Sequence, residues 1–251
     1  MKEILFQIGP FKVYGYGFMI AIGIICAVAL AEKREKKITN KETRVIDIGI
    51  WGLIGGVLGA KLLFWITEIP NIIENPSYLL STLKSGFVVY GGLIGGIIGG
   101  VLYCKKSKTS FWKYFDLVMP SVALAQGFGR IGCLLAGCCY GRKTDAWYGI
   151  VFSSSNFAPV GVRLIPTQII MSAGDFLICI LLLLYARRIK VDGRVGGLYL
   201  ILYSMGRFFV EFLRADERGN VGILSTSQFI AIFMLLLGIV ILWFRRDAKN
   251  R

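Results

Sequence analysis

Residues 129–142 read GRIGCLLAGCCYGR, and they place Arg130 and three cysteines, Cys133, Cys138 and Cys139, inside an otherwise apolar part of the chain. A guanidinium group stays charged when it loses water, and it binds phosphate oxygens through two parallel hydrogen bonds. A thiol beside such a cation ionises more easily, and a thiolate can accept a proton or act as a nucleophile. This segment therefore indicates chemistry on an anionic group.

The stretch YSMGRFFVEFLRADERG is a second place where charge interrupts an apolar run. Its Arg207 and Glu211 lie four residues apart, which places them on one face of a helix. An ionisable residue inside a membrane-spanning helix costs about 2.5–3.5 kcal/mol on insertion scales, so such a residue indicates a function. If Arg130, Arg207 and Arg214 converge near the outer leaflet, we expect an anion site whose ligand is a phospholipid head group.

Simpler interpretations of these charges stay open. Arg207 and Glu211 can form an ion pair that only neutralises the two charges. Arg130 and Lys61 lie near the outer ends of their apolar runs, and long side chains can extend from such positions to the membrane surface.

The cysteines also allow several interpretations. Cys133 can form a disulfide with Cys138 or Cys139 in an oxidising compartment. Three thiols can bind a soft metal ion, but a fourth ligand and a standard spacing are missing, so we expect neither a metal nor a cofactor. Thiols can also act as small buried hydrophobic groups. We expect this packing role for the cysteines that have no partner nearby in the sequence: Cys26, Cys104 and Cys179.

The chain contains no histidine. This excludes Ser-His-Asp and Cys-His nucleophile systems, HExxH metal sites and an imidazole general base. Any acid–base chemistry must therefore use other groups.

The composition is that of a membrane protein, because 55% of the 251 residues are hydrophobic and the mean hydropathy is +0.66. A helix needs about 20 mostly apolar residues to cross the hydrocarbon core. Seven such runs lie near residues 14–32, 46–66, 87–104, 114–133, 166–186, 195–213 and 226–244. The sequence therefore predicts an all-α, polytopic membrane protein with about seven transmembrane helices, in a single domain over residues 1–251.

Basic residues produce the net charge of +14, and they gather in alternate loops. These loops cover residues 33–44, 105–113, 187–194 and 245–251. Positively charged loops stay in the cytoplasm, so we expect the N-terminus outside and the C-terminus in the cytoplasm. This distribution indicates contact with a lipid surface, and we expect no nucleic-acid partner.

Two predicted spans contain repeated glycines, in GLIGGVLGAK and GGLIGGIIGG. Glycines four residues apart let helix backbones approach closely, so they predict helix packing, whereas a nucleotide-binding loop would need a preceding strand. Residues 133–166 are less hydrophobic and are rich in glycine, serine and aromatic residues. They predict a long outer loop whose Trp147, Tyr148 and Phe152 are typical of a membrane interface.

Six motifs together resemble one known family. They are YGYGFMIAIG, GGVLGAKLLF, SGFVVYGGLIGG, GRIGC followed by GCCYGR, RLIPTQ, and YSMGRFFVEFLRADERG. In this order, and over nearly the whole chain, they resemble the prolipoprotein diacylglyceryl transferases of bacteria. The order of so many blocks is far more specific than any single motif.

The resemblance implies a multi-pass enzyme of the bacterial plasma membrane. Such an enzyme moves the diacylglyceryl group of phosphatidylglycerol, or of a related anionic phospholipid, onto the lipobox cysteine of a prolipoprotein signal peptide and releases glycerol phosphate. By position, Arg130, Gly141 and Arg207 match functional residues of the family, and Glu211 and Arg214 match the acidic and basic positions beside them. The residues expected to bind substrate are Gly141, Glu211, Arg214, Gly91, Gly92 and Tyr16.

The chain departs from the family pattern at several positions. Tyr90 stands where the family has a histidine before GGLIG, and Cys133 and Cys138 stand where it has asparagine and glutamate. An arginine is usual at Lys61, and a tyrosine and a glutamate are usual at positions 170 and 171, which are isoleucine and methionine here. Together these changes indicate a divergent subgroup.

The catalytic residues that we expect are Arg130, Arg207, Tyr90, Cys133 and Cys138. The group that replaces histidine as the base stays open. Tyrosine is a poor base unless arginines stabilise its phenolate, so Tyr90 can also be an interfacial or packing residue. Cys138 and Cys139 are the other candidates, because a thiol near Arg130 can ionise.

Other functions remain open at this point. The main alternative is a catalytically altered or inactive homologue that binds phospholipid or acts on a different acceptor, because the histidine is missing. The lack of a C-x2-C pair weakens the case for a thiol redox protein. A channel or transporter predicts two similar halves, and only the two glycine-rich runs resemble each other.

Overall fold

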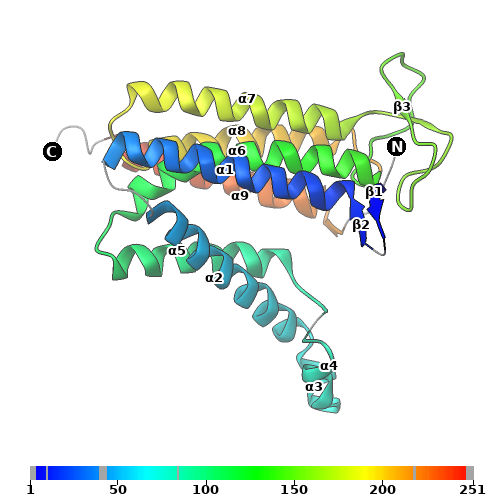
Figure 1. Cartoon of the computed structure of the whole chain (residues 1–251), viewed down its shortest axis with the longest axis horizontal. Helices are drawn as coiled ribbons and strands as arrows, with labels where there is room; N and C mark the ends of the chain where they lie inside the picture. The colour runs from blue at the N-terminus through cyan, green and yellow to red at the C-terminus, as the bar shows by residue number, and fades with distance from the viewer. Residues whose placement is uncertain (1–3, 10, 40–43, 84, 217–218, 247–251) are drawn as a thin grey trace. The chain divides into compact units, whose positions relative to one another are not determined.

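The computed structural model describes residues 4–9, 11–39, 44–83, 85–216 and 219–246. Every predicted span is a helix in Figure 1: α1 (Gly15–Thr39), α2 (Arg44–Thr67), α5 (Val89–Lys106), α6 (Phe111–Ala136), α7 (Thr167–Arg188), α8 (Arg194–Glu211) and α9 (Thr226–Phe244). Residues 40–43 and 247–251, parts of two predicted basic loops, lie outside the described residues. The prediction of an all-α polytopic membrane protein is confirmed.

Five of these helices, α1, α2, α6, α7 and α9, are long and apolar enough to cross a membrane. The other two, α5 and α8, have 18 residues each. Glycines and two terminal lysines make α5 less apolar, and Arg194, Arg207 and Glu211 place charge in α8. These two helices are the ones in which composition departs from that of a simple membrane anchor.

The sequence did not predict the short elements that connect the long helices. Among the described residues these are the helices α3 (Ile69–Glu74) and α4 (Ser77–Ser81) and three antiparallel pairs of strands. The pairs are β1 (Ile4–Ile8) with β2 (Phe11–Tyr14), β3 (Ile150–Val151) with β4 (Arg163–Leu164), and β5 (Asn220–Val221) with β6 (Leu224–Ser225). Elements this short contain too few residues to produce a periodic hydrophobic pattern.

The chain divides into two compact units. Residues 1–34 and 115–251 form the bundle unit, and residues 35–114 form the hairpin unit.

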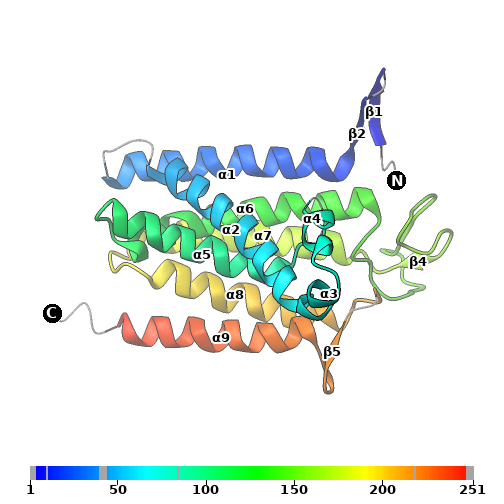
Figure 2. The same ribbon diagram turned by 90° about the horizontal axis from the view of Figure 1, so that it is seen from below.

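Five helices of the bundle unit, α1, α6, α7, α8 and α9, lie side by side in both views (Figures 1 and 2). All three pairs of strands lie at the same end of this bundle, which we call the ribbon end. Helices α1, α7 and α9 begin there, and α6 and α8 end there. The topology therefore brings five separate segments of the chain to one place.

A buried carboxylate at the opposite end fixes three of these helices. Asp116 of α6 accepts hydrogen bonds of 2.8 Å from the backbone amides of Gly193 and Gly196, where α8 begins. An anion is favourable there because the first amides of a helix lack partners and carry partial positive charge. Arg34 of α1 donates to the carbonyl oxygens of Asp116 and Leu117. This connection joins α1, α6 and α8 at the end opposite the ribbon end.

Glycine lines the contact between the two long helices of the hairpin unit. The carbonyl oxygens of Gly55 and Gly59 in α2 lie where side chains would stand on Gly95 and Gly91 of α5. Only residues without a Cβ allow two backbones to approach this closely. The prediction that these glycines pack helices together is confirmed.

Lys61 does not extend to the membrane surface, so that interpretation is wrong. Its side chain is buried, and the ammonium donates to the carbonyl oxygens of Thr82, Ser85 and Gly86, the last two at 2.7 and 3.2 Å. Three aromatic rings surround it, with centroids at 4.8 Å for Phe64, 5.2 Å for Trp65 and 5.1 Å for Phe87. Carbonyl dipoles and ring faces here supply the negative potential that water would otherwise provide.

We expect Gly95→Ala to destabilise the hairpin unit. A Cβ at Gly95 would overlap the carbonyl oxygen of Gly55 and would lie 2.9 Å from the Cα of Gly59, so the helices must separate. The separation costs about 1–3 kcal/mol, which exceeds the gain of about 1 kcal/mol from replacing a helical glycine by alanine. Thermal unfolding of the purified protein in detergent measures the effect.

Gly49→Ala is the matched control, because Gly49 also lies in α2 and nothing approaches its missing Cβ within 4 Å. We expect this variant to be as stable as the wild type or more stable. Equal melting temperatures for the two variants would contradict the proposed packing.

Candidate active site

A sharp turn after α6 brings three cysteines together. The helix ends at Ala136, and Gly137 follows with a φ of +75°, in the left-handed region that favours glycine. The backbone amides of Gly137 and Cys138 donate to the carbonyl oxygens of Leu134 and Cys133, at 3.3 and 3.1 Å. Cys139 also has a left-handed backbone, with a φ of +60°. The chain therefore folds back over the last turn of α6.

The first turn of α7 holds this loop in place. The Nε2 atom of Gln168 donates to the carbonyl oxygen of Cys138, and the hydroxyl of Thr167 donates to that of Cys139, both at 2.8 Å. Gln168 and Thr167 are fully buried. Two buried hydrogen bonds to consecutive carbonyls fix the orientation of the cysteine backbone.

The sulfur atoms of Cys133, Cys138 and Cys139 all lie within 4.8 Å of one another. Their thiols are hydrogen-bonded among themselves, and the Sγ atom of Cys138 also lies 3.7 Å from the carbonyl oxygen of Cys133. The hydrogen bonds from Cys133 and Cys138, followed by the charge and hydrogen bond of Arg214, lower the pKa of the Cys139 thiol. The hydrogen bonds with Cys133 and Cys139 raise the pKa of Cys138. Of the three thiols, Cys139 is the one that its contact with Arg214 favours in the anionic form.

Arg130 lies on α6 one turn before Cys133, and its guanidinium is half-buried. It interacts electrostatically with Tyr203 of α8, with Asp175 of α7 and with the thiols of Cys133 and Cys139. These neighbours place the guanidinium inside the bundle unit and not at the surface. Within the described part of the chain, no residue forms a hydrogen bond or a close ion pair with it, so its donors are available to an anion.

Arg207, Glu211 and Arg214 form a connected chain of charges where α8 ends. The carboxylate of Glu211 lies 2.6 Å from an Nη atom of Arg207 and 3.9 Å from the Nε atom of Arg214. Arg207 also donates to the hydroxyl of Ser227 at 2.7 Å. Arg214 makes a two-armed bond to Asp216, at 2.8 and 2.7 Å. The ion pair between Arg207 and Glu211, which their spacing in the sequence indicated, is therefore one part of a larger network.

Asp175 and Cys139 link this network to Arg130. The carboxylate of Asp175 interacts electrostatically with both Arg130 and Arg207. Arg214 is hydrogen-bonded to the Cys139 thiol, and that thiol also interacts with Arg130. The structure thus brings the three arginines into one polar region at the ribbon end.

Gly141 connects the cysteine loop to the arginines. Its amide donates to the carbonyl oxygen of Ile165 at 3.2 Å, and it forms an antiparallel bridge with Arg214. A Cβ on Gly141 would lie 2.5 Å from the Ile165 carbonyl oxygen and 2.9 Å from the Cγ2 atom of Thr167. Glycine is required because the segment of Ile165 and Thr167 leaves no room for a side chain.

Tyr16 belongs to the same region. It lies in the first turn of α1, where its backbone packs against Gly132 of α6, and it interacts electrostatically with Arg130 and the three clustered thiols. Tyr90, Gly91 and Gly92 lie in the hairpin unit, in the first turn of α5. Their part in the site stays a prediction, and Gly91 packs against Gly59.

Asp175 and Gln168 are buried polar residues that the sequence reasoning missed. Asp175 is 4% exposed, and its Oδ2 atom has no hydrogen-bond partner among the described residues. The rule that flags ionisable residues inside spans would have found it. No comparable signal marks Gln168, because a glutamine in the first turn of a helix is unremarkable without its contacts.

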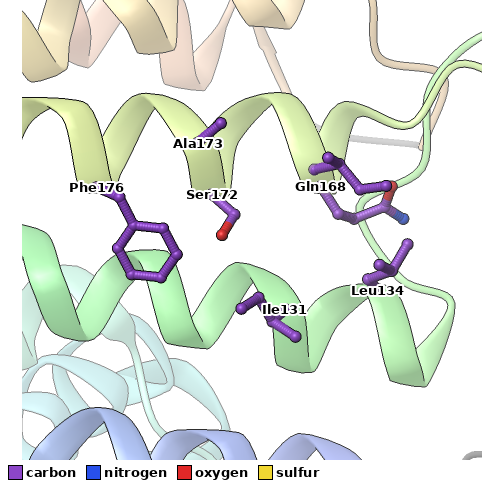
Figure 3. A pocket seen from close by; sticks show the side chains of 7 residues that line it. Ile131, Leu134, Gln168, Ser172, Ala173 and Phe176 are labelled. Carbon is purple, nitrogen blue, oxygen red and sulfur yellow. The ribbon is translucent and has the colours of Figure 1, made fainter. Parts of the chain in front are cut away.

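A small pocket lies between α6 and α7 beside Gln168 (Figure 3). Its volume is about 240 Å³, and most of its lining is apolar, with Ile131, Leu134 and Phe176 among the side chains. Such a pocket fits a hydrocarbon chain better than a charged head group.

The three sulfur atoms are the one group among the described residues that is suited to bind a metal ion. Two guanidinium groups, those of Arg130 and Arg214, interact with this cluster. Their positive charge opposes a bound cation and favours an anion, so we assign no metal to it.

The fold and the site define a polytopic membrane protein with a polar site of arginines and thiols at one end of its helix bundle. The sequence profile of the family described as prolipoprotein diacylglyceryl transferase matches residues 3–244. The chain belongs to this family.

Individual relatives agree with this assignment. The chain is 54% identical to a phosphatidylglycerol–prolipoprotein diacylglyceryl transferase of Clostridium tetani, over 100% of both chains. It is 48% identical to phosphatidylglycerol–prolipoprotein diacylglyceryl transferase 2 of Clostridium perfringens, over 96% of this chain and 94% of the relative. The chain is also 32% identical to a phosphatidylglycerol–prolipoprotein diacylglyceryl transferase of Finegoldia magna, over 96% of this chain and 94% of the relative.

We expect Glu211→Gln to destabilise the bundle unit by about 3–5 kcal/mol, because the change leaves the buried cation of Arg207 without its close carboxylate. A double variant with Arg207→Met and Glu211→Leu removes both charges and should lose less stability. Thermal unfolding in detergent compares the two variants. A Glu211→Gln protein as stable as the wild type would show that the ion pair has no structural role.

Proposed function

We propose that this protein transfers the diacylglyceryl group of phosphatidylglycerol to the lipobox cysteine of prolipoproteins and releases glycerol phosphate. One observation carries the proposal most directly. The half-buried guanidinium of Arg130 has no hydrogen-bond acceptor among the described residues, and it lies in a network with two further arginines. The names of the relatives supply the substrates.

The network suits the chemistry of this reaction. The sulfur of the acceptor attacks the glyceryl carbon, and the carbon–oxygen bond to the phosphate breaks. Negative charge then accumulates on the departing phosphate, so fixed guanidinium groups bind the transition state more strongly than the ground state. Arg130 has open donors for the phosphate, whereas Glu211 and Asp216 hold Arg207 and Arg214 in position.

Other residues in the site support this arrangement. Gly141 fixes the spacing between the cysteine loop and Arg214. Tyr16 interacts electrostatically with Arg130, which supports a role for its hydroxyl in binding the lipid head group. The apolar pocket between α6 and α7 fits part of an acyl chain. Tyr90, Gly91 and Gly92 lie in the hairpin unit, and their contact with substrate stays a prediction from the sequence.

The distribution of charge supports a location in the bacterial plasma membrane with the ribbon end outside. The basic residues at the C-terminus of α7, at the start of α8 and just after α9 lie at the opposite end of the bundle unit. Positively charged loops face the cytoplasm. The site then faces the outer leaflet, where a translocated signal peptide presents its cysteine.

Transfer of labelled diacylglyceryl from phosphatidylglycerol to a lipobox peptide by the purified protein tests the proposal. We expect Arg130→Ala to lower the rate by about 10²–10³-fold, the range typical for loss of one fixed transition-state donor. Arg188→Ala is the control, because Arg188 is exposed at the C-terminus of α7, away from the ribbon end. Lipid binding without any transfer by the folded wild type would sink the proposal and leave a lipid-binding role.

A further inference from the structure

Cys139 differs from the other two clustered cysteines in its backbone conformation and its contacts. Its backbone is held in the left-handed region by the turn after Gly137, and its carbonyl oxygen is bonded to the buried Thr167. Its sulfur lies within 4.8 Å of the sulfurs of Cys133 and Cys138 and is hydrogen-bonded to the guanidinium of Arg214, whereas the Cys138 thiol donates to the carbonyl oxygen of Cys133. A guanidinium donor beside a sulfur stabilises that sulfur as a thiolate.

We propose that the Cys139 thiolate is the general base of the transfer reaction and takes the proton from the thiol of the acceptor cysteine. This proposal rests on the proposed function.

The other candidates for a base are less suitable. Glu211 and Asp216 are held in ion pairs with Arg207 and Arg214, and a carboxylate, with an ordinary pKa of about 4, is a weaker base than a thiolate. Asp175 is 4% exposed, so a peptide cannot reach it, whereas Cys139 is half-buried and accessible. The lowered pKa of Cys139 and the raised pKa of Cys138 agree with a thiolate at position 139.

The chemical step balances without any further reactant. The proton of the acceptor thiol moves to Cys139, and the acceptor thiolate forms a carbon–sulfur bond to the glyceryl carbon. The carbon–oxygen bond breaks, and its electron pair leaves with glycerol phosphate. The proton on Cys139 then passes to this phosphate monoester, whose second pKa is about 6, or to water. Cys139 returns to the thiolate.

Cys139 does not serve as the nucleophile in this scheme. Its attack on the lipid would form a thioether at an alkyl carbon. A second displacement would then have to expel a thiolate from that carbon, with no acyl group to assist it. The proton-transfer role avoids such a stable intermediate.

The protonation of the Cys139 thiol depends on the charged and titratable groups around it. The titratable and charged groups that interact with it come from α6, the loop after α6, the segment after α8, and α1: Cys133, Arg130, Cys138, Arg214 and Tyr16. The two cations and the thiol donors favour its anionic form. Cys139 is therefore expected to stay deprotonated as the pH falls below the ordinary pKa of a cysteine, which is about 8.5.

The first test is alkylation of the wild-type protein with iodoacetamide, followed by mass spectrometry of each cysteine. At pH 6, we expect Cys139 to react on the order of ten times faster than Cys138, because only the thiolate is reactive. This measurement does not require transfer activity, so it stays informative if the proposed function fails. Equal or slower modification of Cys139 would overturn the proposal.

The second test compares the pH dependence of transfer in the wild type and in Cys139→Ser. We expect the variant to lose about 10²–10⁴-fold in kcat with little change in the KM for lipid. Its remaining rate should rise about tenfold per pH unit up to pH 8, because it depends on ionisation of the acceptor thiol alone. The wild-type rate should be nearly independent of pH over the same range.

Cys26→Ser serves as the control, since Cys26 lies in α1 and has no part in the cluster. It should keep the wild-type rate and pH profile. A Cys139→Ser protein that transfers at the wild-type rate and pH profile would overturn the base while leaving the proposed function intact. If that variant does not fold, the alkylation of the wild type decides the matter.

Discussion

A guanidinium group inside a membrane protein needs negative charge nearby, and this requirement organises the ribbon end of the bundle unit. A guanidinium nitrogen of Arg207 lies 2.6 Å from a carboxylate oxygen of Glu211, and two guanidinium nitrogens of Arg214 lie 2.7 and 2.8 Å from the carboxylate oxygens of Asp216. Arg130 has no such close partner among the described residues. The site therefore has one guanidinium whose positive charge is not neutralised at close range until an anion binds. The other two guanidinium groups are held in position by carboxylates.

The backbone of the cysteine loop links these charges to the rest of the fold. Gly137 ends α6 with a left-handed turn, and Gly141 passes between the segments that contain Ile165 and Arg214. Buried side chains at the start of α7 bind the carbonyls between these two glycines. The chemistry of Cys139 and the position of Arg214 thus depend on the same few backbone contacts, and a change in one of them affects both.

Hydropathy and charge in the sequence predict the helices and the three arginines, because burial in lipid imposes a strong and regular pattern. The glycine repeats likewise predict close helix packing, and the structure shows that the two glycine-rich helices, α2 and α5, pack against each other. The pattern does not reveal that Arg214 contacts Cys139 rather than Cys138, since this depends on a left-handed residue in an irregular loop. It also does not reveal that carbonyls of a later segment bind Lys61 inside the hairpin unit.

The role of Arg130 in binding the phosphate of the lipid substrate can be tested with a crystal structure of the protein bound to a short-chain phosphatidylglycerol. We expect a phosphate oxygen about 2.7–2.9 Å from a guanidinium nitrogen of Arg130, the usual length of a charge-assisted hydrogen bond. A head group bound elsewhere, with Arg130 facing water or a protein carboxylate, would show that Arg130 does not bind the phosphate.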